Sequence, residues 1–123
     1  MRGNCVRATG GETVEEPGRL FDVVVSCEGA KMVELEIRKG VYVRYADGML
    51  TLDMGDEGYG RDQRLIELSE LRDLRVLSDT TMVEIFANGG EAALTSRTYS
   101  PAVPAMELHA EGVASMDFYR LAH

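Results

Sequence analysis

Glycine turn signals divide this chain into short segments along most of its length, and this spacing restricts the possible folds more than any other feature of the sequence. The turns include Glu28-Gly29, Lys39-Gly40, Asp47-Gly48, Asn88-Gly89 and Glu111-Gly112. Asn88-Gly89 is the strongest hairpin signal, because both residues tolerate the positive φ that a type I′ turn requires. No segment between the turns has a convincing pattern for a helix of three turns, so the spacing predicts an all-β protein.

Alternation of apolar and polar residues locates the strands between these turns. The clearest strand sets a packed group of side chains against a solvated group: Val33, Leu35 and Ile37 against Glu34, Glu36 and Arg38. Such alternation is typical of an antiparallel strand with one wet face. Similar runs occupy residues 20–26, 41–45, 49–53, 64–68, 74–79, 82–88, 92–99, 105–110 and 115–121. About nine or ten short strands predict a two-sheet antiparallel β-sandwich of the jelly-roll or concanavalin type.

The first 18 residues differ from the rest of the chain. They are polar and contain Gly10-Gly11, and the only strand candidate among them is a short one at residues 4–8. We expect residues 1–18 to form a frayed leading segment and residues 19–123 to form the sandwich. A chain of 123 residues is long enough for one such domain.

Charge and hydropathy exclude two classes of partner. Thirteen basic residues against twenty-one acidic residues give a net charge of −8, which repels phosphate backbones and anionic lipid surfaces. We therefore expect no nucleic-acid partner and no membrane partner. The sequence contains neither a membrane-spanning apolar run nor the apolar core of a signal peptide, which predicts a cytoplasmic protein. Cys5 and Cys27 are then expected to be reduced thiols, with a disulfide as the alternative in an oxidising compartment.

Few residues are suited to catalysis or to metal binding. The only histidines are His109 and His123, so a Ser-His-Asp triad is not expected. The spacing of cysteine and histidine does not fit zinc, and the acidic loop at residues 55–62 lacks the alternating ligands of an EF-hand. We expect no catalytic residue, no metal and no cofactor. The tyrosines Tyr42, Tyr45, Tyr59 and Tyr99 are candidates for contact with a sugar ring, the alternative being packing at a sheet margin or an interface.

One stretch of the chain resembles a known family. Residues 74–91, LRVLSDTTMVEIFANGGE, and the following strand, Thr95-Ser96-Arg97-Thr98-Tyr99, closely resemble the signature of the C-terminal β-sandwich of glycoside hydrolase family 32. That family contains invertases, sucrose-6-phosphate hydrolases, levanases and inulinases. The chain departs from the pattern at Gly89, where Asp is usual, and at Thr80, where Arg is common. A weaker resemblance extends back to about residue 20 and so covers about residues 20–121.

The resemblance implies a part of a β-fructofuranosidase rather than a whole enzyme. In the family the sandwich follows a five-bladed propeller, and the catalytic Asp and Glu belong to propeller motifs. Those motifs are absent here, because Arg61-Asp62 is followed by Gln63 instead of proline and Cys27-Glu28 has the reversed order. We expect a non-catalytic accessory domain that stabilises a propeller in cis, with a homodimer as a further candidate assembly.

Two other functions stay open at this point. The first is a lectin-like module that binds fructans or sucrose, and the second is a small enzyme that uses a pair of carboxylates. Glu84 and Arg97 are the candidate interface residues, and Glu84 is expected to form an ion pair with Arg75 or Arg97 across the sheet.

Overall fold

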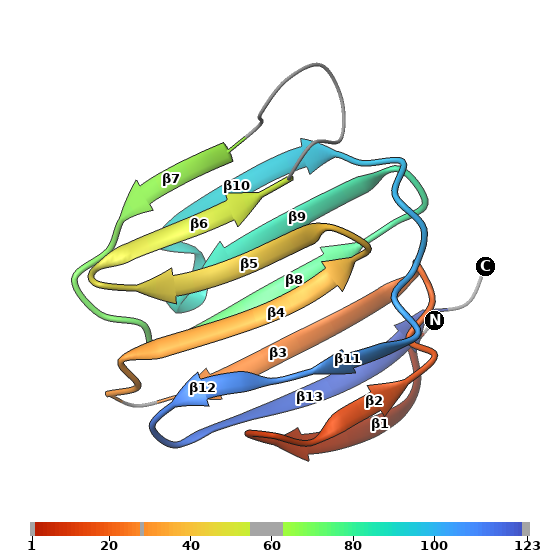
Figure 1. Cartoon of the computed structure of the whole chain (residues 1–123), viewed down its shortest axis with the longest axis horizontal. Coiled ribbons are helices and arrows are strands. Elements are labelled where there is room, and N and C mark those ends of the chain that lie inside the picture. The colour runs from red at the N-terminus through yellow and green to blue at the C-terminus, as the bar shows by residue number, and fades with distance from the viewer. Residues whose placement is uncertain (1, 28, 55–62, 122–123) are drawn as a thin grey trace.

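Antiparallel strands form the whole framework of the molecule and lie in two layers (Figure 1). The computed structural model describes residues 2–27, 29–54 and 63–121. The strands are β1 (Arg2–Thr9), β2 (Thr13–Glu15), β3 (Phe21–Cys27), β4 (Met32–Arg38), β5 (Val41–Ala46), β6 (Met49–Asp53), β7 (Gln63–Glu67), β8 (Asp73–Ser78), β9 (Met82–Ala87), β10 (Ala92–Arg97), β11 (Ala105–Glu107), β12 (His109–Glu111) and β13 (Ala114–Leu121). A single 3-10 turn, Asn88–Gly90, is the only helical element among the described residues. The all-β sandwich predicted from the sequence is confirmed.

The predicted number of strands, nine or ten, is wrong, because the described residues form thirteen. The run predicted at residues 105–110 is divided at Leu108 into β11 and β12, which pair with different strands, β2 and β4. In the segment before residue 19, β1 includes the short strand considered at residues 4–8, and β2 is a further strand. Alternation within one run cannot show such a division, because the division depends on which strand each half of the run pairs with.

Two main sheets build the sandwich. One has six strands in the order β1-β13-β3-β8-β9-β10, and the other has five in the order β12-β4-β5-β6-β7. The two-stranded sheet β11-β2 adjoins the five-stranded sheet, since β11 also contacts β4. Every pair of neighbouring strands is antiparallel.

The leading segment belongs to this framework. β1 forms the edge of the six-stranded sheet and runs antiparallel to β13, with Val6 opposite Phe118 and Arg7 opposite Asp117. β2 pairs with β11, and the intervening Gly11 donates a backbone hydrogen bond to the carbonyl of Leu108 at 2.8 Å. The structure therefore differs from the frayed segment expected there: both strands find their partners near the other end of the chain.

The inner faces of the two sheets form one apolar core. Val33, Leu35 and Ile37 are all buried, as their alternation predicts, and the rings of Phe21 and Phe118 pack 5.4 Å apart. Each fully buried side chain of this size contributes about 1.5 to 3 kcal/mol to stability. In the described residues no helix is long and apolar enough to cross a membrane, and the cytoplasmic location stays a prediction. Cys5 and Cys27 are both free thiols.

Arg38 is a buried cation within this core. The sequence pattern places it on the solvated side of its strand, but it is 0% exposed. The pairing of β4 with β5 shifts register between Glu36 and Arg38, and this irregularity turns the Arg38 side chain inward. Its Nε donates to Ser78 Oγ at 3.1 Å. Its terminal nitrogens donate to the carbonyls of Ser100, Asp79 and Thr80. Arg38 thus ties β4 of one sheet to the β8–β9 turn of the other.

Replacement of Arg38 by methionine is expected to lower the free energy of unfolding by about 3 kcal/mol, because it leaves buried carbonyl oxygens without a donor. Urea denaturation measures the loss. The matched control is Arg44→Met, which removes a surface arginine that pairs with Glu34 at 2.8 Å and should cost less than about 1 kcal/mol. Equal losses in the two variants would show that the Arg38 network does not hold the sheets together.

Candidate functional site

The candidate tyrosines do not form one platform. Tyr42 lies half-buried on the outer face of the five-stranded sheet, whereas Tyr45 points into the core and donates a hydrogen bond from its hydroxyl to the carbonyl of Leu68 at 2.8 Å. Tyr99 follows β10 and is 70% exposed. Tyr59 lies outside the described residues. Tyr42 and Tyr45 therefore face opposite sides of the same strand.

The outer face of the five-stranded sheet is acidic. Its register brings together the carboxylates Glu34, Glu36, Asp53, Glu67 and Glu111. Among them, Tyr42 has its pKa raised, chiefly by the charge of Glu36. Glu34 pairs with Arg44 at 2.8 Å, and the apolar side chains of Met32, Met49 and Leu65 share this face.

The outer face of the six-stranded sheet has a different character. Five half-buried apolar side chains define what we call the apolar face, and they are Val24 on β3, Leu77 on β8, Met82 and Phe86 on β9, and Leu121 on β13. The register aligns Val24 with Arg75 and Arg75 with Phe86, so these residues form one row across the sheet. A wet sheet face usually carries polar side chains, and an apolar group there is a feature of interaction surfaces.

Two ion pairs neutralise charges on this outer face. Asp22, 1% exposed, accepts from both Nε and a terminal nitrogen of Arg75, at 3.0 and 2.8 Å. Asp117 accepts from Arg7 in the same bidentate way, at 2.7 and 3.0 Å. These bonds raise the pKa of each arginine and lower the pKa of Asp117. Arg75 therefore has a partner other than the expected Glu84.

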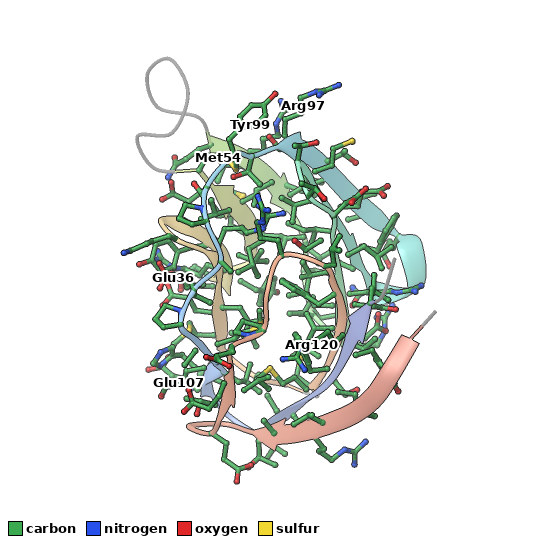
Figure 2. All side chains as sticks on the ribbon, turned by 90° about the vertical axis from the view of Figure 1, so that its right-hand side faces the viewer. Glu36, Met54, Arg97, Tyr99, Glu107 and Arg120 are labelled. Atoms are coloured by element: carbon green, nitrogen blue, oxygen red, sulfur yellow. The ribbon has the colours of Figure 1, made fainter. Side chains whose placement is uncertain are left out.

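Glu84 lies within the apolar face, and Arg97 lies at its margin. The register sets Glu84 opposite Leu77 on β8 and Thr95 on β10. Arg97, at the end of the edge strand β10, projects from the top of the molecule (Figure 2). Within residues 2–27, 29–54 and 63–121, no ion pair joins Glu84 to Arg75 or Arg97. The interface role of both residues stays a prediction.

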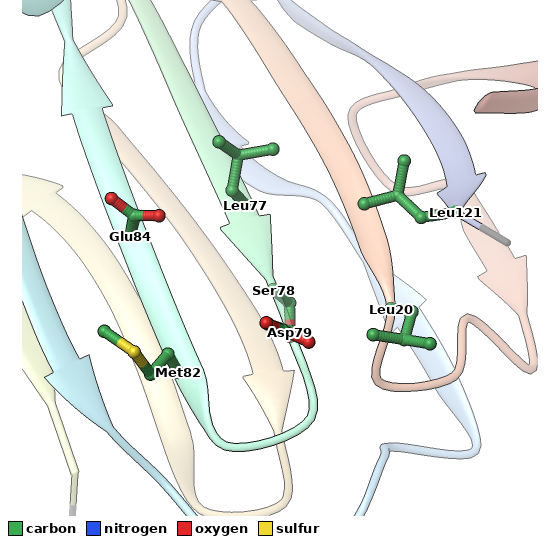
Figure 3. Close-up of a pocket in the computed structure, with 7 residues that line it drawn as sticks. All are labelled: Leu20, Leu77, Ser78, Asp79, Met82, Glu84 and Leu121. Carbon is green, nitrogen blue, oxygen red and sulfur yellow. The ribbon is translucent and has the colours of Figure 1, made fainter. Parts of the chain in front are cut away.

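A depression of about 380 Å³ opens on the apolar face beside Glu84 (Figure 3). We call it the carboxylate depression, and it is lined by Leu20, Leu77, Ser78, Asp79, Met82, Glu84 and Leu121. The β8–β9 turn is held in place, because the backbone N–H of Asp79 donates to the carbonyl of Met82 at 2.8 Å. Ser78 Oγ accepts from Arg38 and donates to the carbonyl of Arg19 at 2.7 Å. Sequence reasoning missed Arg38 and Ser78, whose contacts arise only between sheets.

A second depression, of about 320 Å³, lies further along the same face. Its lining is Val24, Asp73, Arg75, Phe86, Gly89 and Gly90. The Asn88–Gly90 turn bounds it, and Asn88 and Gly89 have φ of 52° and 70°, so the predicted positive-φ hairpin is confirmed. The loop comprises residues 88–91, since Ala87 pairs with Ala92. Asn88 Oδ1 accepts from the Arg72 N–H at 2.7 Å and so fixes the turn to the preceding segment.

No group of three or more metal-binding side chains occurs in the part of the chain that the structure describes. His109 lies exposed on β12, with Nε2 3.6 Å from the Glu107 carboxylate. The acidic loop at residues 55–62 lies outside the described residues.

Comparisons with known proteins identify relatives of this sandwich. The family model described as "Glycosyl hydrolases family 32 C terminal" matches residues 26–121. The chain is similar in structure to the sucrose-6-phosphate hydrolase from Lactobacillus gasseri, with a TM-score of 0.75 and 16% identity over 98% of this chain. It is similar to a β-fructofuranosidase of Bombyx mori, with a TM-score of 0.72 and 18% identity over 99% of this chain. It spans 28% of the length of each of these enzyme chains.

A galectin shares the fold over its full length. The galectin from Caenorhabditis elegans has a TM-score of 0.62 and 14% identity, over 95% of this chain and 96% of the galectin. None of the curated proteins matches the sequence. At these identities, the likeness to solved structures shows the fold alone.

The ion pair between Arg7 and Asp117 makes a pH-dependent contribution that can be measured. Arg7 holds the pKa of Asp117 below its ordinary value of 3.8. A carboxylate with a lowered pKa in the folded state stabilises the fold above its unfolded pKa and loses that contribution as the pH falls through the folded pKa. Arg7→Gln should therefore raise the pKa of Asp117 towards 3.8 and weaken the pH dependence of stability below that value.

Carboxyl-carbon NMR titration measures this shift. Glu12 provides the internal control, because its lowered pKa depends on hydrogen bonds from Thr9 and should not change in Arg7→Gln. An unchanged pKa of Asp117 in the variant would contradict the assignment of the shift to Arg7.

Proposed function

Because this chain belongs to the family of glycosyl hydrolase family 32 C-terminal domains, we propose that it is a non-catalytic accessory domain that binds the catalytic domain of a β-fructofuranosidase through its apolar face. The contrast between the two outer faces carries this proposal. One face carries five carboxylates beside a few apolar side chains, while the other presents Val24, Leu77 and Phe86 beside two ion pairs and the carboxylate of Glu84. This chain spans 28% of the length of each of two similar enzyme chains, which supports a role as one part of a larger enzyme.

The ion pairs of the apolar face suit it to burial. A charge that loses its hydration on docking destabilises a complex unless it has a partner. Asp22 is already buried and is satisfied by Arg75 within this chain. Docking can therefore cover the row of Val24, Arg75 and Phe86 without leaving Asp22 unpaired, and the apolar side chains supply the favourable free energy.

Hydrolysis of a fructoside is assigned to the partner. The sequence lacks the propeller motifs that carry the family's catalytic carboxylates, as Arg61-Asp62-Gln63 illustrates. The parent enzyme would act on sucrose, sucrose 6-phosphate or a fructan. Self-association of this chain through the same face is a secondary proposal, because an uncovered apolar face also attracts a second copy.

The accessory role is tested with the catalytic domain of the parent enzyme, produced separately. This chain alone should release no fructose from sucrose, sucrose 6-phosphate or inulin. When added to the catalytic domain, it should raise the melting temperature or the rate of that domain. Fructose release by the chain alone, or a catalytic domain unaffected by its addition, would overturn the proposal.

The face responsible is tested by a pair of aromatic substitutions. Phe86→Ser on the apolar face should weaken binding to the catalytic domain at least about tenfold, which equals about 1.4 kcal/mol. Tyr42→Ser on the acidic face is the matched control and should leave binding unchanged. Circular dichroism confirms that both variants fold. Weaker binding by Tyr42→Ser alone would place the docking surface on the other sheet.

A lectin-like module is the second candidate function, and the full-length match to a galectin favours it. Of the candidate tyrosines, Tyr42, in register with Asp53 on the acidic face, and Tyr99, which is 70% exposed, reach the surface of the described chain. Calorimetric titration with sucrose and inulin tests this function. Saturable binding that Tyr42→Ala or Tyr99→Ala abolishes would support it, and no binding up to about 10 mM sugar would exclude a useful affinity.

A further inference from the structure

The carboxylates of the carboxylate depression differ from the other acidic groups on the outer face of the six-stranded sheet. Asp22 and Asp117 each pair with an arginine of this chain. Glu84 and Asp79, by contrast, have no cationic partner within residues 2–27, 29–54 and 63–121. The residues opposite Glu84 in the sheet, Leu77 and Thr95, carry no charge. The depression therefore holds negative charge that the described chain does not neutralise.

Of the arginines near the depression, Arg38, Arg75 and Arg120 are engaged elsewhere, whereas Arg97, opposite Met82 in the sheet, has no ion pair within residues 2–27, 29–54 and 63–121. Arg75 is held by Asp22, and Arg38 donates to backbone carbonyls and to Ser78 from inside the core. Arg120 donates to the carbonyl of Glu16 at 2.6 Å and lies 5.6 Å from the centre of the Phe118 ring. Arg97 projects from the end of β10, away from the body of the molecule (Figure 2).

Apolar side chains and polar groups share the lining of the depression, and its base is fixed. Figure 3 shows Leu77 and Met82 close to Glu84, with Leu20 and Leu121 across the depression. Asp79 lies at the β8–β9 turn, where its Oδ1 accepts from the Thr80 N–H at 2.6 Å. Arg38 binds the carbonyls of this turn from inside the sandwich. The shape of the turn is therefore set before any partner binds.

We propose that the carboxylate depression is a socket for one arginine or lysine side chain of the catalytic domain. The inference rests on the proposed function and specifies the chemistry of its partner. Arginine and lysine carry a cation on a long aliphatic stem, so the stem packs on leucine and methionine while the cation meets Glu84 and Asp79. A metal ion would need more ligands, and the net charge of −8 disfavours a second copy of this chain at an acidic site.

The first test uses a small probe and this chain alone. Acetyl-arginine methylamide and its neutral counterpart, acetyl-citrulline methylamide, are titrated separately into the labelled protein and followed by amide NMR. The arginine probe should bind with a Kd of about 1 mM and shift the amides of Leu77, Met82 and Glu84. Glu84→Gln should weaken this binding at least about fivefold. Glu36→Gln, on the acidic face, is the matched control.

Equal shifts with the citrulline probe, or shifts centred on the five-stranded sheet, would overturn the socket. The second test measures binding of the separate catalytic domain to wild type, Glu84→Gln and Glu36→Gln. We expect Glu84→Gln alone to weaken binding, about thirtyfold, with a smaller loss in high salt. Wild type and Glu84→Gln binding equally would overturn the socket while leaving the proposed function intact. No binding by wild type would overturn both the proposed function and the assignment of the socket to that domain.

Discussion

The buried guanidinium of Arg38 is the contact on which the arrangement of the two sheets most depends. A cation removed from water destabilises a fold unless each of its donors finds an acceptor. Arg38 meets this requirement with Ser78 Oγ and with carbonyls of residues 79, 80 and 100, all outside its own sheet. Ser78 ends strand β8, and the three carbonyls belong to the β8–β9 turn and to the segment after β10. One side chain therefore satisfies the backbone of both segments and fixes their positions.

The order imposed by Arg38 extends to the outer surface. The carbonyls that it binds belong to the β8–β9 turn, whose other side carries Asp79. Ser78 transmits the same constraint, because its hydroxyl connects Arg38 to the carbonyl of Arg19. The carboxylate depression is thus shaped from within the core, and a preorganised surface loses less entropy when a partner binds.

The sequence predicted the fold well, because local patterns carry that information. Alternation identified the core side chains Val33, Leu35 and Ile37, and the tolerance of Asn88 and Gly89 for positive φ identified their hairpin. The prediction failed where the structure depends on residues distant in sequence. β1 and β2 pair with β13 and β11, whose positions alternation cannot give.

The candidate site shows the same limit. Glu84 was placed on an outer face correctly, but Arg75 pairs with Asp22 because β8 lies beside β3, a neighbour that is not adjacent in the chain. The alternation placed Arg38 on the solvated side of its strand. In the structure, a shift of register between Glu36 and Arg38 reverses the direction of the side chains that follow it, and the sequence pattern does not reveal this shift. Sequence patterns thus identify which residues form strands, whereas ion pairs and sockets arise from the order in which those strands assemble.

The two kinds of structural neighbours differ in how much of each chain the sandwich occupies. The galectin consists almost entirely of this fold, while the two enzymes contain it as 28% of their chains. The fold alone therefore does not decide between a free module and a part of a larger enzyme. The chemistry of the outer faces supports our proposal that the chain is part of a larger enzyme. Val24, Leu77 and Phe86, on a face whose buried carboxylate is already neutralised, are better suited to contact with protein than to water, and this favours the larger enzyme.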